Sequence, residues 1–240
     1  VLHISGKILF TGTFSNFSTS SVYEQIRPSI AYSNKNVKIC ASHAGLTLGE
    51  DGATHQVLED IGMMKMLPGM TVINTCDYNQ TKAATLAIAD FEGPVYLRFG
   101  RPVVPVFMPE DMPFEIGKGI LLQEGTDVTI VATGHLVWES LVAAEELEKE
   151  GISCEIIDLR TVRPMDYDAI INSVKKTNRL VVLEEAWPFA SVASEITYMV
   201  QERAFDYLDA PLQRITTADT PAPYSPTLLK QWWPNAQEVL

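Results

Sequence analysis

Hydrophobic residues in this chain form short runs that alternate with stretches of helical spacing. Most of the runs are rich in Val and Ile and are apolar at successive positions, which is typical of strands buried on both faces of a parallel sheet. The predicted strands are Ile8–Thr11, Val37–Ala41, Thr71–Asn74, Val95–Phe99, Val128–Ala132, Ser153–Ile157, Leu180–Glu184 and Gln213–Thr216.

Helical patterns occupy the stretches between these runs. Val57, Ile61 and Met64 predict a helix that starts near His55 and stops before Pro68-Gly69. The other predicted helices are Asn79–Phe91, His135–Glu150, Asp166–Lys176 and Ser191–Phe205. Strands that alternate with helices in this way predict an α/β fold.

A proline-rich stretch without helical periodicity, Pro102–Lys118, divides the pattern into two parts. Such a stretch is typical of a linker between domains. We therefore predict two doubly wound α/β domains, residues 1–108 and residues 119–240.

The composition argues against some classes of function. The chain has 240 residues, of which 46% are hydrophobic, and a net charge of −12. This acidity argues against a nucleic-acid partner, and no apolar run approaches the roughly 20 residues of a membrane helix. The three cysteines, Cys40, Cys76 and Cys154, are widely spaced and predict buried thiols in a reducing cytoplasm. The first residues lack the layout of a signal peptide and an initiator Met, so we expect a processed or truncated product.

The segment Ala41–Gln56 holds two of the four histidines and two acids in one Gly-rich loop between a predicted strand and a predicted helix. Loops of this kind carry the sites of open α/β folds. His43 follows the strand, and His55 is expected in the first helical turn, where the free N–H groups attract anions and favour a neutral imidazole. Asp51 could accept a hydrogen bond from a hydroxyl. The alternative is a turn whose polar residues are merely solvated, and the pattern alone does not decide between them.

Two further features could carry chemistry. Arg101 follows a strand end and could hold a phosphate bidentately, although a surface arginine beside a proline turn explains it equally well. Phe14 and Phe17 lie three residues apart at a helix start, a spacing that more often indicates core residues than a platform for a flat heterocycle. The sequence shows no cluster of acids with metal-ligand spacing, and no dinucleotide fingerprint or nucleophile elbow.

The first part of the chain, from about Gly6 to Gly151, resembles the pyrimidine-binding domain of transketolase. The matching motifs are Thr11–Phe17, Ala41–Leu46, Gly49–Gln56 and Arg98–Pro102. The resemblance implies that Phe14 and Phe17 flank the aminopyrimidine ring of thiamine diphosphate. It also implies that His43, Asp51 and His55 contact a sugar substrate and that Arg101 binds its distal phosphate.

The second part, from about Ser153 onward, resembles the C-terminal domain of the pyruvate dehydrogenase beta subunit. The matching motifs are Ile157–Pro164, Glu184–Phe189, Tyr207–Pro211 and Ala218–Tyr224. Both families belong to one thiamine-dependent superfamily with the same domain order, so a composite of the two is structurally sensible. The join is expected within or just after the helix His135–Glu150, and the sequence leaves open whether the composite is natural or assembled.

The resemblance implies a transketolase half that moves a two-carbon ketol unit between sugar phosphates of the pentose phosphate pathway. An N-terminal section or alpha subunit would complete it as a homodimer or heterotetramer and would hold most of the Mg²⁺ ligands. The cofactor-activating glutamate of the family would fall just before Val1 and is therefore expected to be missing. The alternatives are the beta subunit of a 2-oxo acid dehydrogenase and a non-catalytic assembly module.

Overall fold

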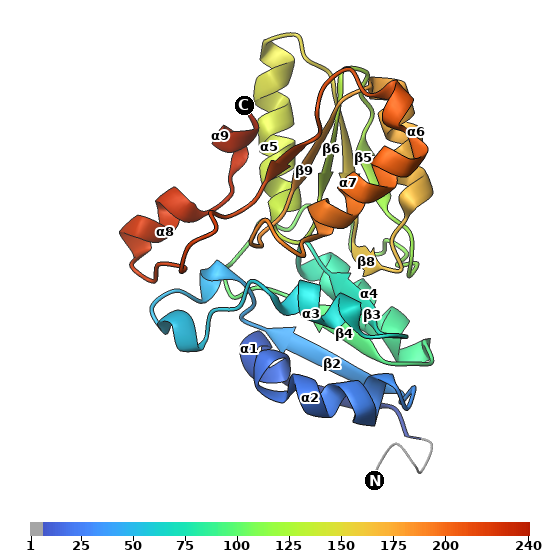
Figure 1. Cartoon of the computed structure of the whole chain (residues 1–240), viewed down its shortest axis with the longest axis vertical. Coiled ribbons are helices and arrows are strands. Elements are labelled where there is room, and N and C mark those ends of the chain that lie inside the picture. Colours follow the sequence, from blue (N-terminus) through green and yellow to red (C-terminus); the bar gives the residue numbers. More distant parts are fainter. Residues whose placement is uncertain (1–6) are drawn as a thin grey trace.

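The chain folds into two α/β units, one above the other in Figure 1. The computed structural model describes residues 7–240, so the first six residues of the predicted domain 1–108 lie outside the described part. Each unit is built around a five-stranded sheet with helices packed on it. The predicted α/β class is therefore confirmed.

The first sheet has the strand order β1-β2-β4-β3-β8. Its strands are β1 Leu9–Phe14, β2 Val37–Ser42, β3 Thr71–Asn74, β4 Val95–Arg98 and β8 Thr161–Arg163. The first four strands are parallel, whereas β8 runs antiparallel to β3. This last strand comes from the second half of the chain, so the first sheet includes residues from beyond the linker.

The second sheet has the order β10-β9-β6-β7-β5. Its strands are β5 Ile120–Gln123, β6 Val128–Ala132, β7 Cys154–Asp158, β9 Leu180–Leu183 and β10 Gln213–Ile215. All are parallel except the edge strand β5. The eight predicted strands are all present, and the antiparallel edge strands β5 and β8 were not predicted.

Three of the longer helices begin where the sequence supplies a side-chain cap. Asp77, Asp166 and Ser191 each accept a hydrogen bond from the backbone N–H three residues ahead. The helices of the described chain are α1 Ser15–Ser18, α2 Tyr23–Ile26, α3 Asp60–Met66, α4 Tyr78–Asp90, α5 Leu136–Lys149, α6 Tyr167–Thr177, α7 Val192–Arg203, α8 Pro226–Trp232 and α9 Ala236–Val239. Shorter helical turns occur at Ser20–Val22, Arg27–Ala31, Leu46–Leu48, Gly52–Thr54 and Phe205–Tyr207. No described helix is long and apolar enough to span a membrane.

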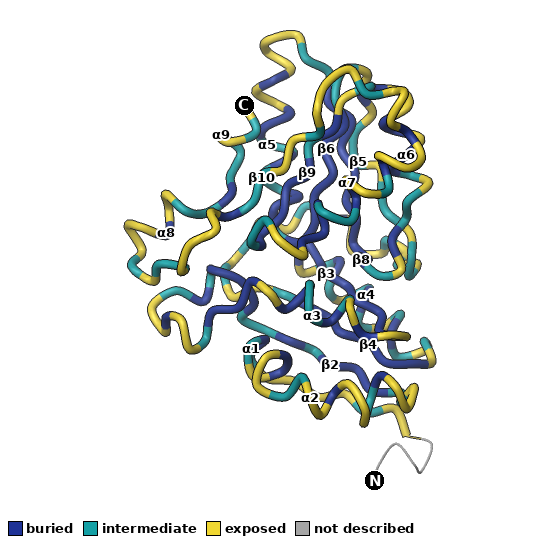
Figure 2. The backbone as a smooth tube through the Cα atoms, viewed as in Figure 1, coloured by how far each residue is buried: buried dark blue, intermediate teal, exposed yellow. Residues whose placement is uncertain are grey.

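One buried cluster joins the two units. It contains Val72 and Tyr96 of the first sheet together with Ile157 and Val182 of the second. In Figure 2 the buried strands of both sheets form the interior, and exposed residues gather on the helices and loops. The carboxyl ends of β1, β2 and β4 lead into the segments described next.

Candidate functional site

Two neighbouring strand ends place an aromatic ring and an imidazole together. Phe14 ends β1, and the parallel register pairs it with Ser42, so that His43 follows directly beside it. The rings of Phe14 and His43 stack with centroids 3.9 Å apart and an angle of 17° between their planes. His43 has a φ of 58°, a left-handed conformation that turns the chain away from the sheet immediately after β2.

A second aromatic ring lies on the turn that follows β1. Phe17, in α1, lies nearly parallel to Phe14, with ring centroids 6.3 Å apart and an interplanar angle of 16°. Phe17 is 39% exposed and Phe14 is half-buried. The interpretation of this pair as core residues is therefore wrong for Phe17, whose ring is open to solvent beside the parallel ring of Phe14.

The structure corrects the predicted position of His55. It follows the short 3₁₀ turn Gly52–Thr54, and helix α3 begins only at Asp60. The expected attraction of anions to His55 by a helix N-terminus therefore does not apply. The imidazole instead lies edge-on to Phe17, at 5.1 Å between ring centroids, and its Nδ1 is 2.8 Å from the Thr54 hydroxyl.

The loop that carries His55 is tied to the aromatic turn. Asn16, between the two phenylalanines, donates a hydrogen bond from Nδ2 to the Thr54 carbonyl at 2.6 Å. This contact explains why two segments 38 residues apart present their rings to the same place.

Arg101 and Asp51 supply the charges around these rings. Arg101 Nη1 lies 3.7 Å from Asp51 Oδ2 and donates to the Leu48 carbonyl at 2.6 Å. Both charged side chains are about half exposed. Burial and the positive charge of Arg101 lower the pKa of His43, while Asp51 opposes this shift. His43 is therefore neutral at pH 7, and its Nδ1 lies 2.9 Å from the Ser42 hydroxyl.

The structure thus brings together all six residues that the sequence singled out. Phe14, Phe17, His43 and His55 form one aromatic group, and the pair Asp51–Arg101 lies near enough to influence His43. Within residues 7–240, no group of three or more His, Cys, Asp or Glu side chains could hold a metal ion.

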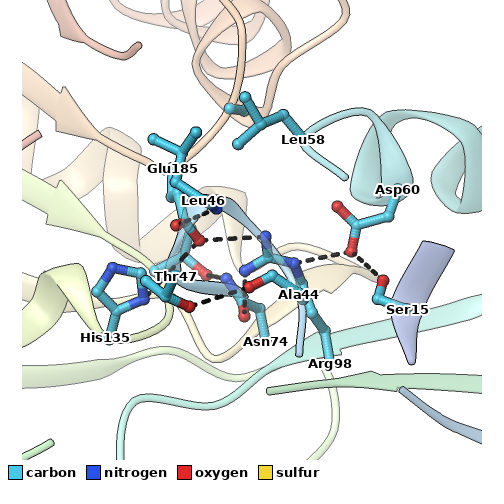
Figure 3. A network of polar contacts seen from close by, with 12 residues as sticks. Ser15, Ala44, Leu46, Thr47, Leu58, Asp60, Asn74, Arg98, His135 and Glu185 are labelled. Carbon is cyan, nitrogen blue, oxygen red and sulfur yellow. Dashed lines mark hydrogen bonds and ion pairs between the residues drawn. The ribbon is translucent and has the colours of Figure 1, made fainter. Parts of the chain in front are cut away.

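A buried charge network, not predicted from the sequence, lies beneath the loop between β2 and α3 (Figure 3). Arg98 at the end of β4 is 2% exposed; its Nε lies 2.8 Å from Asp60 and its Nη2 lies 3.3 Å from Glu185. Burial alone would lower the pKa of Arg98, but the two carboxylates raise it. One Asp60 oxygen also accepts hydrogen bonds from the hydroxyls of Ser15 and Tyr96.

Glu185, which follows β9, connects the second unit to the site loop. Its Oε1 accepts a hydrogen bond from the Leu46 N–H at 2.8 Å, and its Oε2 accepts from Arg98. Gly45 is required at this point because it has a φ of 79° and a Cβ there would lie 1.9 Å from Glu185 Oε2. The second unit therefore fixes the loop that follows His43.

Sequence reasoning missed these three charged residues. The available signal was their position, since Arg98 and Glu185 each close or follow an apolar strand at the carboxyl edge of a sheet. Nothing in the local pattern could show that residues 87 apart would pair.

Comparison with known proteins places this geometry in a family. Residues 2–106 match the family described as the transketolase pyrimidine binding domain, and residues 117–239 match the transketolase C-terminal domain. The chain belongs to the transketolase family. The resemblance recognised in the sequence is thereby confirmed, and with it membership of the thiamine diphosphate-dependent superfamily.

Individual relatives of this transketolase-family chain agree. It is 45% identical over 186 residues to a putative transketolase C-terminal section of Methanocaldococcus jannaschii, which covers 77% of this chain and 58% of that protein. It is 52% identical over 113 residues to the mitochondrial pyruvate dehydrogenase E1 component subunit beta of Dictyostelium discoideum, which covers 47% of this chain and 32% of that one. A solved structure described as a split gene transketolase, inactive beta4 tetramer, covers 99% of this chain and 75% of that one, with a TM-score of 0.88 and 36% identity.

Proposed function

We propose that this chain is one half of a thiamine diphosphate-dependent transketolase and transfers a two-carbon ketol unit between sugar phosphates when an N-terminal section completes it. The observation that carries the proposal is the convergence of Phe14 and Phe17 with His43, His55 and Arg101 on one solvent-open face. The domain limits 1–108 and 119–240 and a reducing cytoplasmic setting remain part of the proposal; the three cysteines are free.

The described residues fit the flat end of the cofactor. Phe14 and Phe17 present nearly parallel rings, the arrangement suited to holding a planar heterocycle by stacking. When bound, thiamine diphosphate supplies an electron sink for breaking a carbon–carbon bond next to a carbonyl. We propose that Mg²⁺ and the diphosphate are held mainly by the partner section, in a homodimer or heterotetramer that closes the open face.

The polar side chains are assigned to the sugar. His43 is neutral at pH 7, and with the Ser42 hydroxyl donating to Nδ1 its Nε2 carries the proton and donates to a substrate oxygen. His55, oriented by Thr54, faces the same aromatic rings and takes a second oxygen. Asp51 accepts a hydrogen bond from a substrate hydroxyl, and Arg101 binds the distal phosphate with the N–H groups that Leu48 leaves free.

The decisive assay is ketol transfer from a ketose phosphate. The chain is mixed with a transketolase N-terminal section, thiamine diphosphate and Mg²⁺, and the same assay is run with a chain extended upstream, because this chain spans 58% of the length of the Methanocaldococcus relative. Transfer that needs both sections supports the proposal. Absence of transfer in both mixtures, although the cofactor binds, would refute it.

Arg101→Ala is expected to raise KM for phosphorylated substrates by about 10-fold or more, because a charge-assisted hydrogen bond contributes about 1.5–3 kcal/mol. The matching unphosphorylated sugar is the control, and its KM should change little. Steady-state kinetics on both sugars provide the measurement. Equal losses for the two sugars would assign Arg101 a structural role.

Asp51→Ala is expected to lower turnover for hydroxylated substrates more than for simple ones, because a lost hydrogen bond to a buried hydroxyl costs about 1–3 kcal/mol. The comparison pairs each sugar with its deoxy analogue in the same assay. A uniform loss would rule out this role for Asp51.

A second candidate function is the beta subunit of a 2-oxo acid dehydrogenase, favoured by the similarity to the Dictyostelium subunit. Arg101 and the two histidines favour the transketolase, because a small oxo acid has no distal phosphate to bind. Decarboxylation of pyruvate with an alpha subunit, in place of ketol transfer, would reverse the assignment. A third candidate, a non-catalytic assembly module, requires that no thiamine diphosphate binds to the completed assembly.

A further inference from the structure

A C-terminal segment of the second unit, Thr217–Trp232, packs against both ends of the loop that carries the two histidines. Apolar side chains of this segment, here called the strap, form one cluster with the buried Leu46 and Leu58, which follow His43 and His55 by three residues each. The strap includes most of helix α8, which Figure 1 shows at the left of the molecule. The function proposed above assigns no role to this segment.

Gln56 connects the strap to the residue that precedes it, His55. Its Nε2 donates a hydrogen bond to the Pro223 carbonyl of the strap at 2.9 Å and a longer one to the Leu46 carbonyl at 3.5 Å. Because both partners are carbonyl oxygens, only a side chain that donates hydrogen bonds can join them. Gln56 is also buried, so water does not replace these contacts easily. The backbone beside His55 is therefore attached to the second unit.

Tyr224 supports the same loop from the strap. Its ring lies against Gly52, where a Cβ would be 3.7 Å from Tyr224 Cδ1. Gly52 begins the turn Gly52–Thr54, and its carbonyl accepts hydrogen bonds from the N–H groups of His55 at 2.9 Å and of Gln56 at 3.0 Å. The strap therefore contacts the chain both before and after His55.

We infer that Gln56 is a positioning residue, through which the strap of the second unit sets the orientation of His55 toward Phe17. The hydrogen bond of Asn16 holds the loop from the first unit at Thr54, and Gln56 holds it from the second. His55 lies between these two attachments, so a change at Gln56 alters the edge-on angle between its imidazole and the Phe17 ring. This effect belongs to the chain alone, whereas its consequence for a sugar substrate rests on the proposed function.

The test follows the His55 imidazole by NMR spectroscopy of the full chain without a partner. The ring current of Phe17 shifts the Cε1–H signal of His55, so the signal reports the geometry of the two rings. Gln56→Met keeps the length of the side chain and removes the donor. Gln56→Glu keeps its shape but, at pH 8, brings a carboxylate against two carbonyl oxygens. Both variants are expected to move the His55 signal by more than its linewidth, and Gln56→Glu is expected to move it further. The signal of His135, which is buried in the second unit, should stay in place.

A second variant covers the case in which the Gln56 variants do not fold. Tyr224 is 61% exposed, so Tyr224→Ala removes its contact with Gly52 without opening the core, and it is also expected to move the His55 signal. Tyr198→Ala is the matched control, because Tyr198 is 64% exposed and lies on helix α7. This control is expected to leave the His55 signal unchanged.

Kinetics of the completed assembly measure the consequence for the reaction. Gln56→Met is expected to lower kcat/KM for a ketose phosphate by about 10-fold, the effect of one misplaced hydrogen bond, while the Kd of thiamine diphosphate stays within about twofold. The two values separate because His55 is assigned to the sugar, and Phe14 and Phe17 to the cofactor. Absence of ketol transfer in the wild-type assembly refutes the proposed function, whereas the NMR measurement on the chain alone still decides this inference.

Three results overturn the inference. The first is a His55 signal that keeps its wild-type position in both Gln56 variants. The second is a smaller shift in Gln56→Glu than in Gln56→Met, the order expected if Gln56 only fills space, because Glu is closer to Gln in shape. The third is an equal shift of the His55 and His135 signals, which would show a general disturbance of the fold.

Discussion

Arg98→Met is expected to lower the free energy of unfolding by about 3–5 kcal/mol, the usual cost of removing one partner from a buried ion pair. Arg98, Asp60 and Glu185 are 2%, 0% and 3% exposed, so the two carboxylates would remain in the interior without their common cation. Met keeps the unbranched aliphatic stem of Arg, so the measured loss of stability reports the removal of the guanidinium charge and not a change in packing.

The matched control is Arg101→Met, three residues further along the chain. Arg101 pairs with Asp51 at 3.7 Å, and both side chains are about half exposed, so the loss should stay below about 1 kcal/mol. Urea unfolding followed by far-ultraviolet circular dichroism and tryptophan fluorescence measures both variants. For Arg98→Met, the unfolding transitions followed by circular dichroism and by fluorescence should no longer coincide, because the network joins a strand of the first sheet to the turn after β9.

A third variant tests the electrostatic reasoning itself. Adding Asp60→Asn and Glu185→Gln to Arg98→Met removes every unpaired charge and should recover part of the lost stability. The reasoning fails if the triple variant is less stable than Arg98→Met, or if the Arg98 and Arg101 variants lose equal amounts.

Two further predictions concern stability. Gly45→Ala should cost about 2–4 kcal/mol in thermal or urea unfolding, since its Cβ would meet Glu185, whereas Gly69→Ala, which has a φ of 75° and nothing within 4 Å, should cost only about 1 kcal/mol of backbone strain. Similar losses of stability in the two variants would show that the contact between the added Cβ and Glu185 does not determine the cost. Burial raises the pKa of Asp158 to about 6, above its ordinary value of 3.8, so its favourable contribution to stability is complete below pH 4 and is lost as the pH rises through 6. Between pH 5 and pH 8 the wild type should lose about 1 kcal/mol relative to Asp158→Asn, and parallel stability curves for the two proteins would contradict the raised pKa.

Local patterns predicted most of the strands because their apolar residues are consecutive, and most of the longer helices because their apolar residues recur at helical spacing. The strand β8 has three residues, of which only Val162 is apolar, and β5 is only partly buried. The helix expected to start at His55 starts later because of a contact with a separate segment of the chain. The Gly45 N–H donates to the Val57 carbonyl at 3.0 Å, which holds Val57 in a bridge and delays the helix until Asp60.

The candidate site was predicted through its motifs, whose residues lie close together in sequence. The residues that support the site were not predicted, because Arg98 and Glu185 meet only after both units have formed. An arginine at the end of an apolar strand is compatible with a solvated strand end as well as with a buried ion pair. The distinction depends on which side chain the rest of the fold brings to it.

The position of β8 also sets an order for folding. The fifth strand of the first sheet is made of Thr161–Arg163, and it becomes available only after β5, β6 and β7 of the second sheet have left the ribosome. Until then β3 is an open edge, with backbone groups free to pair with another nascent chain. Closing that edge joins residues about 90 positions apart, a slow step that exposes the chain to aggregation while it waits. A ribosome that pauses shortly before Thr161 would therefore hold the chain at its most vulnerable point.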